Sequence, residues 1–158
     1  MAPKTSAPSG PALRGCTNFK LRQITRAVTR RYDAAVAAAG LKTTQYSLLS
    51  HIAALGPVRP SDLAANMGLE LSTLSRNLQP LVAQGWAVLG PGPDARTRLV
   101  SLTDAGRAKR TEAQRLWKQA QLQLNETLGE GRVTQLHQLI EESLALLGGE
   151  DEGDGDAD

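Results

Sequence analysis

The sequence is poor in the residues on which several protein classes depend. Aromatic residues make up 3% of the 158-residue chain, and Cys16 is its single cysteine. One cysteine cannot form an intrachain disulfide, which fits a reducing, cytoplasmic setting. The sequence has no stretch of about 18 consecutive apolar residues, so we expect no membrane-spanning helix. Residues 1–16 lack the apolar core of a secretory signal, and we expect them to form a flexible arm.

With so few aromatic rings, the core has to be built mainly from Ala, Leu and Val. Apolar residues make up 41% of the chain, and this choice of aliphatic residues favours helices. Glycine and proline cluster near the two ends and in two interior turns, which leaves long windows of helical periodicity between them. We therefore predict a mainly α fold with one small β-hairpin. The length fits one domain, or one domain with an appended oligomerisation element.

The net charge of +2 hides an uneven distribution. Residues 150–158 hold six acids and no base. Removing these six from the 16 acids of the chain leaves ten against 18 basic residues, so the remainder carries +8. A body of that sign suits a polyanionic partner such as double-stranded DNA. We expect residues 148–158 to form a disordered acidic tail that aids solubility; a DNA mimic that competes for the basic face is the alternative.

Apolar residues recur at helical spacing in six windows that end at glycine or proline. One helix is expected within residues 17–39, and two long helices are expected within residues 104–147. Residues 44–103 hold three shorter helices followed by a hairpin, and Val58 could add one or two residues of strand. Pro80 falls inside the fourth helix, where we expect a bend rather than a stop.

The third and fourth helices have the form of a helix-turn-helix, with a three-residue turn at residues 68–70. The fourth helix is expected to bury one apolar stripe, made of Leu74, Leu78, Leu81 and Val82. Its opposite face carries hydroxyls, amides and one guanidinium, the groups that read base edges or bind phosphates in DNA: Ser72, Thr73, Ser75, Arg76, Asn77 and Gln79. An ordinary solvated face is the alternative, but this one lacks the Glu, Asp and Lys that such faces use heavily.

A short hairpin follows this helix, with strands expected around residues 86–88 and 99–102. Its tip reads GPGPDARTR, in which glycine and proline shape a turn. Arg96 and Arg98 suit insertion into a narrow, electronegative minor groove. Asp94 has the wrong sign to contact phosphate, so we expect it to hold an arginine in position. An ordinary hairpin loop is the alternative.

These segments together resemble the winged helix-turn-helix of the MarR family of bacterial transcription regulators. The resemblance is carried by SDLAANMGLELSTLSRNLQPLVAQGW and PDARTRLVSLTDAGR. The family's Asp-x-Arg wing signature falls on Asp94-Ala95-Arg96, and its Leu-Thr-x-x-Gly signature falls on Leu102 to Gly106. The resemblance extends over roughly residues 21–147. It implies a homodimer in which helices within 17–39 and 104–147 interlock, while residues 44–103 bind a pseudo-palindromic DNA operator.

The resemblance also implies a repressor that a small ligand, often an aromatic acid, releases from DNA. The ligand would occupy a cleft between the dimerisation helices and the winged unit. Candidate lining residues are Tyr32, Tyr46, His51 and Trp117; packed core residues are the alternative reading of each. We expect His51 to be a buried histidine with a hydrogen bond rather than a ligand contact. Neither histidine has further ligands at metal spacing, so we expect no metal and no cofactor.

Three alternatives remain open. Some relatives sense peroxides through a cysteine near the start of the first helix, and Cys16 has basic neighbours that would favour a thiolate. In those relatives a tyrosine follows the cysteine by four positions, whereas Lys20 stands here. A non-specific architectural DNA-binding protein would also use a basic body. An enzyme pairing Cys16 with His51 or His137 would need an oxyanion loop or similar motif, which the sequence lacks, so we expect no enzyme.

Overall fold

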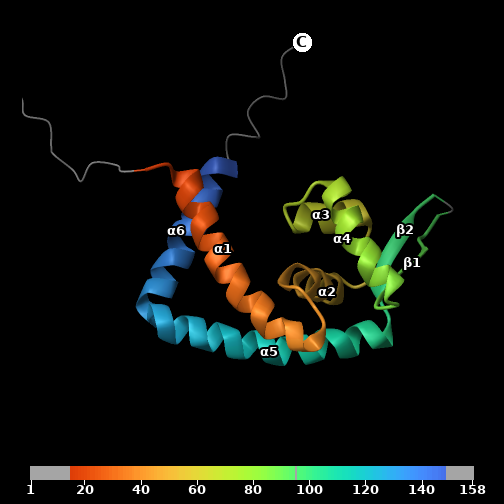
Figure 1. Cartoon of the computed structure of the whole chain (residues 1–158). Helices are drawn as coiled ribbons and strands as arrows, with labels where there is room; N and C mark the ends of the chain where they lie inside the picture. Colours follow the sequence, from red (N-terminus) through yellow and green to blue (C-terminus); the bar gives the residue numbers. More distant parts are fainter. Residues whose placement is uncertain (1–14, 95, 149–158) are drawn as a thin grey trace, which may run out of the picture.

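The computed structural model describes residues 15–94 and 96–148 (Figure 1). Residues 1–14 of the expected arm (residues 1–16) and most of the expected acidic tail lie outside the described residues. The described residues confirm a mainly α fold with one antiparallel hairpin. The elements, in chain order, are α1 (Thr17–Val36), η1 (Ala37–Ala39), α2 (Thr43–Leu55), α3 (Pro60–Asn66), α4 (Leu71–Ala83), β1 (Ala87–Pro91), β2 (Arg98–Leu102), α5 (Asp104–Leu128) and α6 (Glu130–Gly148).

The helices divide into an outer frame and an inner winged unit. In Figure 1, α5 runs along one side and α6 rises from one of its ends, while α1 starts beside α6 and runs down to meet α5 away from that end; α2, α3, α4 and the hairpin lie together over the other part of α5. We call α1, α5 and α6 the frame, and α2, α3, α4 and the hairpin the winged unit. The largest fully buried side chains come mainly from the winged unit: Leu48, Leu49, Ile52, Leu63, Leu74, Leu81, Val36 and Val100. Helix α5 packs against α1, α2 and β2, so it joins the frame to the winged unit.

The helix-turn-helix forms where the sequence predicts it. Pro60 occupies the first turn of α3, where its missing N–H costs nothing. Gly68 adopts a φ of 62°, which lets the chain reverse direction before α4. Helix α4 then continues through Pro80 to Ala83, so the proline does not stop the helix.

One member of the predicted α4 stripe is wrong. Leu74, Leu78 and Leu81 are buried, but Val82 is 36% exposed. Position 82 lies about 100° around the helix from position 81. There Val82 faces a groove that it lines with Leu89 of β1, and no element closes that groove within the described chain.

The hairpin pairs Ala87 with Leu102 at its base and Pro91 with Arg98 near its tip. Val58 adds a one-residue bridge to Val100, through two backbone hydrogen bonds of 3.0 and 2.8 Å, as the sequence suggested. Trp86 was expected in the first strand but lies just before it. Its carbonyl accepts a hydrogen bond from the Thr103 amide instead, at 3.1 Å.

A close junction joins the base of the hairpin to α5. The Thr103 hydroxyl donates to the Gly85 carbonyl at 2.6 Å and accepts from the Gly106 amide at 3.0 Å, which caps α5. Gly106 is buried, and a Cβ atom at this position would lie 1.9 Å from the Trp86 carbonyl oxygen. The Leu-Thr-x-x-Gly signature therefore describes a cap and a contact that leaves no room for a side chain.

The frame helices leave much apolar surface uncovered within one chain. Helix α6, expected from residue 132, begins at Glu130 and carries no buried residue. The exposed large apolar residues of the frame are Phe19, Leu21, Ile24, Leu122, Leu139, Ile140, Leu144, Leu146 and Leu147. None of the described helices is both long and apolar enough to cross a membrane.

Candidate nucleic-acid interface and adjoining cleft

The polar face of α4 has a centre and two margins. Ser72 and Arg76, one turn apart, are both fully on the surface. The Arg76 guanidinium donates to the Thr73 hydroxyl over a long 3.5 Å. Because this is its one hydrogen bond with a described side chain and it forms no ion pair with one, most of its donors are free to bind another partner.

The other predicted residues of this face lie toward its margins. Thr73 and Asn77 are half-buried, and Asn77 lines a hollow of about 320 Å³ with Ser47 of α2. On the opposite margin, Ser75 and Gln79 are exposed and line a groove toward β1. The Ser75 hydroxyl donates to the Leu71 carbonyl of its own helix at 2.8 Å. The sequence grouped these residues as one face, whereas the structure turns them in different directions.

The wing tip is held closed by one carboxylate. Asp94 Oδ1 accepts from the backbone amide of Arg96 at 2.9 Å, and from the amide and the hydroxyl of Thr97 at 2.7 Å each. These hydrogen bonds lower the pKa of Asp94 below its ordinary value; the bond from the Thr97 hydroxyl has the largest effect, and the bonds from the amides of Arg96 and Thr97 come next. Asp94 therefore fixes Arg96 by its main chain and leaves the guanidinium unpaired among the described side chains.

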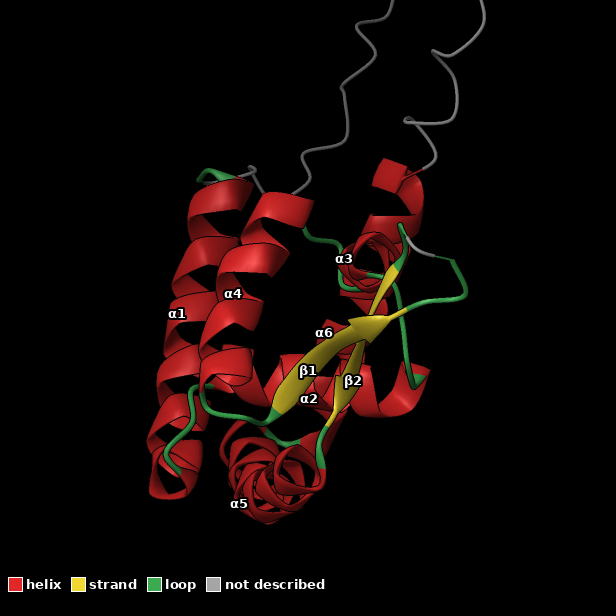
Figure 2. Cartoon of the chain, turned by 90° about the vertical axis from the view of Figure 1, so that its right-hand side faces the viewer, coloured by secondary structure: helices red, strands yellow, loops and turns green. Residues whose placement is uncertain are grey.

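The wing lies beside α4. Helix α4 packs against β1, and Figure 2 views α5 nearly end-on, with the hairpin rising from it next to α4. Arg96 and Arg98 are both exposed, and neither forms an ion pair with a described residue. The polar face of α4, which carries one arginine and no acid, thus adjoins a hydrogen-bonded wing with two more arginines. Such an arrangement can contact a groove of DNA and the neighbouring phosphate backbone at the same time.

A separate cleft of about 370 Å³ lies between the frame and the winged unit. It brings together three of the four predicted ligand residues, and its lining is Tyr32, Thr43, Tyr46, Ser47, Ser50 and Trp117. The ring centroid of Trp117 lies 6.0 Å from that of Tyr32 and 5.9 Å from that of Tyr46. Burial raises the pKa of Tyr32, so its phenol stays protonated and donates to the Gln121 side chain.

His51, the fourth predicted residue, does not line this cleft. Its ring is half-buried, and Nδ1 lies 2.8 Å from the Ser47 carbonyl oxygen one turn earlier in α2. That contact agrees with the hydrogen-bonded histidine that the sequence suggested. Among the residues that the structure covers, no three His, Cys, Asp or Glu side chains gather as metal ligands.

Comparison with known proteins identifies the family. The MarR family model matches residues 39–97. The transcriptional regulator MosR of Mycobacterium tuberculosis, solved in complex with DNA, is 31% identical; the similarity covers 82% of this chain and 98% of MosR, with a TM-score of 0.67. The chain belongs to the MarR family. It is a DNA-binding transcription regulator with a winged helix-turn-helix.

Two further comparisons agree with this assignment. A cysteine-to-serine mutant of Escherichia coli MarR bound to operator DNA has the same fold, with a TM-score of 0.75 at 24% identity; the similarity covers 80% of this chain and 92% of that protein. An uncharacterised helix-turn-helix regulator of Bacillus subtilis, YwoH, is 26% identical over 93 residues, which are 59% of this chain and 68% of YwoH.

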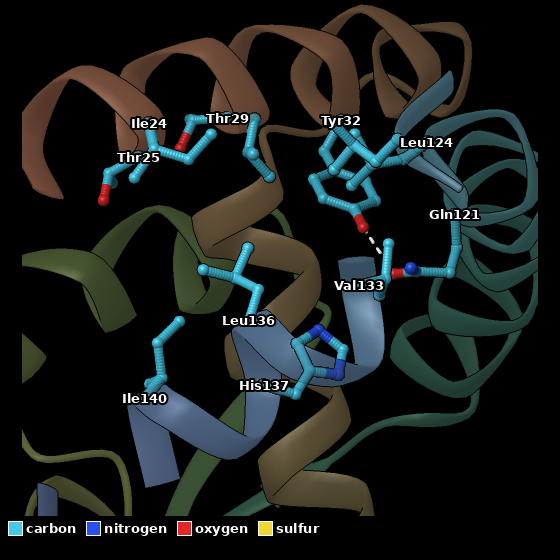
Figure 3. Close-up of a pocket in the computed structure, with 12 residues that line it drawn as sticks. Ile24, Thr25, Thr29, Tyr32, Gln121, Leu124, Val133, Leu136, His137 and Ile140 are labelled. Carbon is cyan, nitrogen blue, oxygen red and sulfur yellow. Dashed lines mark hydrogen bonds between the residues drawn. The ribbon is translucent and has the colours of Figure 1, made fainter. Parts of the chain in front are cut away.

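This MarR-family chain also has an apolar hollow that the sequence did not predict. It has a volume of about 270 Å³ and lies where α1, α5 and α6 meet (Figure 3). Ile24, Val133 and Leu136 contribute to its walls, and His137 of α6 lies at its edge. The apolar stripes of the three helices were visible in the sequence. The pattern of a single sequence does not show, however, that three helices leave a hollow between them.

Cys16 stands immediately before α1, as the residue that caps it. The thiol is exposed and unpaired, and the Cys16 carbonyl accepts from the Lys20 amide at 3.1 Å. The cysteine is thus remote in sequence from α4 and the wing, and it belongs to the frame of this MarR-family regulator.

Proposed function

We propose that the protein is a cytoplasmic homodimeric repressor that binds a pseudo-palindromic operator and is released from it by a small ligand. The observation that carries this proposal is the pairing of the acid-free polar face of α4 with a wing whose tip Asp94 holds in shape. The face supplies donors and acceptors for base edges, and the wing supplies two arginines that pair with no described carboxylate.

Each part of the interface takes its own role in this proposal. Arg76 and Ser72, at the centre of the α4 face, enter the major groove, where an arginine pairs best with guanine. Thr73, Asn77, Ser75 and Gln79 contact bases or phosphates toward the two margins. Arg96 and Arg98 contact the neighbouring minor groove or the phosphate backbone of the DNA. Asp94 acts on DNA only through the loop that it holds.

The dimer is supported by the apolar residues that one chain leaves uncovered on α1, α5 and α6. Contiguous apolar surface of this kind is rare on soluble monomers and marks an interface. A twofold dimer would present two α4 helices about 34–36 Å apart, one turn of DNA. A ligand in the cleft between Tyr32 and Tyr46 would act where α1 and α5 meet α2, so it would alter the spacing of the two α4 helices.

The proposal is tested by selecting bound sequences from random DNA and measuring affinity for the selected and the scrambled site. A regulator should prefer its palindrome by about 10³-fold, whereas an architectural protein would show little preference and a steep salt dependence. Arg96→Ala should weaken operator binding about tenfold, with unchanged folding and oligomeric state, because it removes one cation from the wing. Affinity equal to that of the parent protein would contradict the role of the wing.

A second candidate is redox control through Cys16, which is favoured by the exposed, unpaired thiol at the start of α1. Thiol oxidation in the frame could change the dimer and so the DNA affinity. Mild peroxide should then lower operator affinity in proportion to the oxidation of Cys16, which mass spectrometry measures. The substitution Cys16→Ser should abolish this response. Unchanged binding by the oxidised protein would remove this candidate.

A further inference from the structure

Arg59 is an exposed cation outside the interface that the sequence predicted. It stands at the N-cap position of α3, where its side chain forms no cap. The residues that stabilise such a position accept hydrogen bonds from the first amides of the helix, whereas a guanidinium only donates them. Its charge also lies at the positive end of the helix, where a cation is unfavourable. The side chain of Arg59 thus does not stabilise the start of α3.

The backbone places Arg59 beside the wing. The preceding residue, Val58, forms an antiparallel bridge with Val100 of β2. In an antiparallel pair the residue that follows Val58 falls opposite the residue that precedes Val100. Arg59 therefore lies alongside Leu99, one step nearer to the wing tip, and Arg98 is the next residue of β2 in that direction. Helix α3 itself packs against both α4 and β2.

The charge of Arg59 reaches the wing tip but is not neutralised there. The hydrogen bonds within the loop, above all the one from the Thr97 hydroxyl, lower the pKa of Asp94 most, and the positive charge of Arg59 lowers it further. Arg59 nevertheless forms no ion pair with Asp94 or with another described carboxylate. Together with Arg96 and Arg98 it makes a group of three exposed arginines around the wing.

Arg59 also adjoins the boundary between α4 and the wing. The next residue, Pro60, lines the groove at this boundary with Ser75 and Gln79 of α4 and Leu89 of β1. In double-helical DNA one sugar-phosphate strand separates a major groove from the minor groove beside it. A protein that puts α4 into one groove and its wing into the next holds that strand against this boundary.

We infer that Arg59 binds a phosphate of the DNA strand that runs between the groove contacted by α4 and the groove contacted by the wing. A guanidinium suits this role, because two of its N–H groups can donate to the oxygens of one phosphate. Such a contact fixes the register of the protein on the duplex and carries no sequence information. The inference rests on the proposed function for the placement of α4 and the wing in neighbouring grooves.

The inference is tested by fluorescence anisotropy with the full-length protein, on the selected operator and on a scrambled duplex, at several salt concentrations. Arg59→Gln should weaken binding to both duplexes by the same factor, about tenfold, because a phosphate contact does not depend on sequence. The slope of log affinity against log salt concentration should become shallower by about 0.9 for each bound protomer. Unchanged affinity, an unchanged slope, or a loss confined to the operator would overturn the inference.

Two further substitutions at this position separate the charge from a structural role. Arg59→Lys keeps the charge, so it should keep most of the affinity and the salt slope of the parent protein. Arg59→Thr introduces a capping residue, so the melting temperature of the free protein should stay equal or rise while DNA affinity falls as in Arg59→Gln. A structural role predicts a lower melting temperature with an unchanged salt slope, and that result contradicts the phosphate contact. An equal loss of affinity in Arg59→Lys and Arg59→Gln contradicts it too.

Arg115→Gln is the matched control. Arg115 is an exposed arginine of α5 that forms no ion pair with a described residue, so this variant loses the same charge outside α3, α4 and the wing. Its affinity should change by less than about twofold, because salt screens an exposed charge that does not touch the DNA. A loss equal to that of Arg59→Gln would show an effect of net charge alone and would exclude the contact.

The parent protein tests the proposed function in the same titrations. Equal affinity for the operator and the scrambled duplex contradicts the proposed repressor, and the salt slopes on both duplexes still decide whether Arg59 binds phosphate. A clear preference for the operator together with an unchanged slope in Arg59→Gln contradicts the assignment of Arg59 alone.

Discussion

At the scale of single residues, the wing depends on one carboxylate that forms no ion pair with an arginine among the described residues. Asp94 accepts three hydrogen bonds from the main chain and hydroxyl that follow it. The sequence indicated that Asp94 holds an arginine, and the structure locates that hold at the amide of Arg96.

The order of the wing should therefore depend on pH. These hydrogen bonds lower the pKa of Asp94, so the ionised form stabilises the loop above the ordinary aspartate pKa. That contribution is lost as the pH falls through the lowered folded-state value. We expect the Thr97 amide to exchange faster with solvent below this value, in hydrogen-exchange measurements by NMR. In Asp94→Asn the acid-dependent step should disappear, and a Thr97 amide whose exchange shows the same step in both proteins would contradict the assignment.

At the scale of elements, the junction between the hairpin and α5 fixes where the wing stands. Gly106 has no space for a side chain against the Trp86 carbonyl, and Thr103 bonds to both sides of the junction. Lys109 adds a third contact: its ammonium donates to the Ala39 carbonyl at 3.1 Å and lies 5.7 Å from the Trp86 ring centre.

Gly106→Ala should lower the free energy of unfolding by about 3 kcal/mol, because the new methyl group forces α5 away from the Trp86 backbone. Chemical denaturation measures this loss. Gly131→Ala is the matched control: Gly131 lies in α6 with nothing within 4 Å of a Cβ atom, so alanine should leave stability unchanged or raise it by about 0.5–1 kcal/mol. Equal effects at the two glycines would show that the contact is not restrictive.

The sequence predicted the positions of the helices and strands better than it predicted which of their faces are buried. Glycine and proline mark the ends of α2, α3 and α4, and leucine spacing predicted the buried stripe at Leu74, Leu78 and Leu81. Val82 was assigned wrongly because burial depends on whether another element covers that side. The division of the α4 polar face has the same cause: Asn77 is half-buried and lines a hollow with residues of α1, α2 and the turn after α3, and periodicity within one helix carries no information on its neighbours.

At the scale of the whole molecule, the described chain leaves many large apolar side chains exposed. Helix α6 buries no residue, and Leu144 and Leu147 near its end are 64% and 66% exposed. Each large aliphatic side chain that a partner covers would contribute about 1.5–3 kcal/mol. Helices α1 and α5, which also carry exposed apolar residues, line one side of the aromatic cleft, so the assembly of two chains and the response to a ligand would act through shared elements.

Leu144→Asp should convert the proposed dimer into a monomer, because a carboxylate in an apolar interface costs several kcal/mol. Sedimentation velocity at micromolar concentration measures the change. Operator affinity should fall at least about a hundredfold, since one protomer holds one half-site. Leu55→Asp is the control, because Leu55 is also exposed, at 42%, but ends α2 outside the frame; it should stay dimeric. If Leu144→Asp sedimented as the parent protein does and bound the operator equally well, the dimer interface would have to lie outside the end of α6.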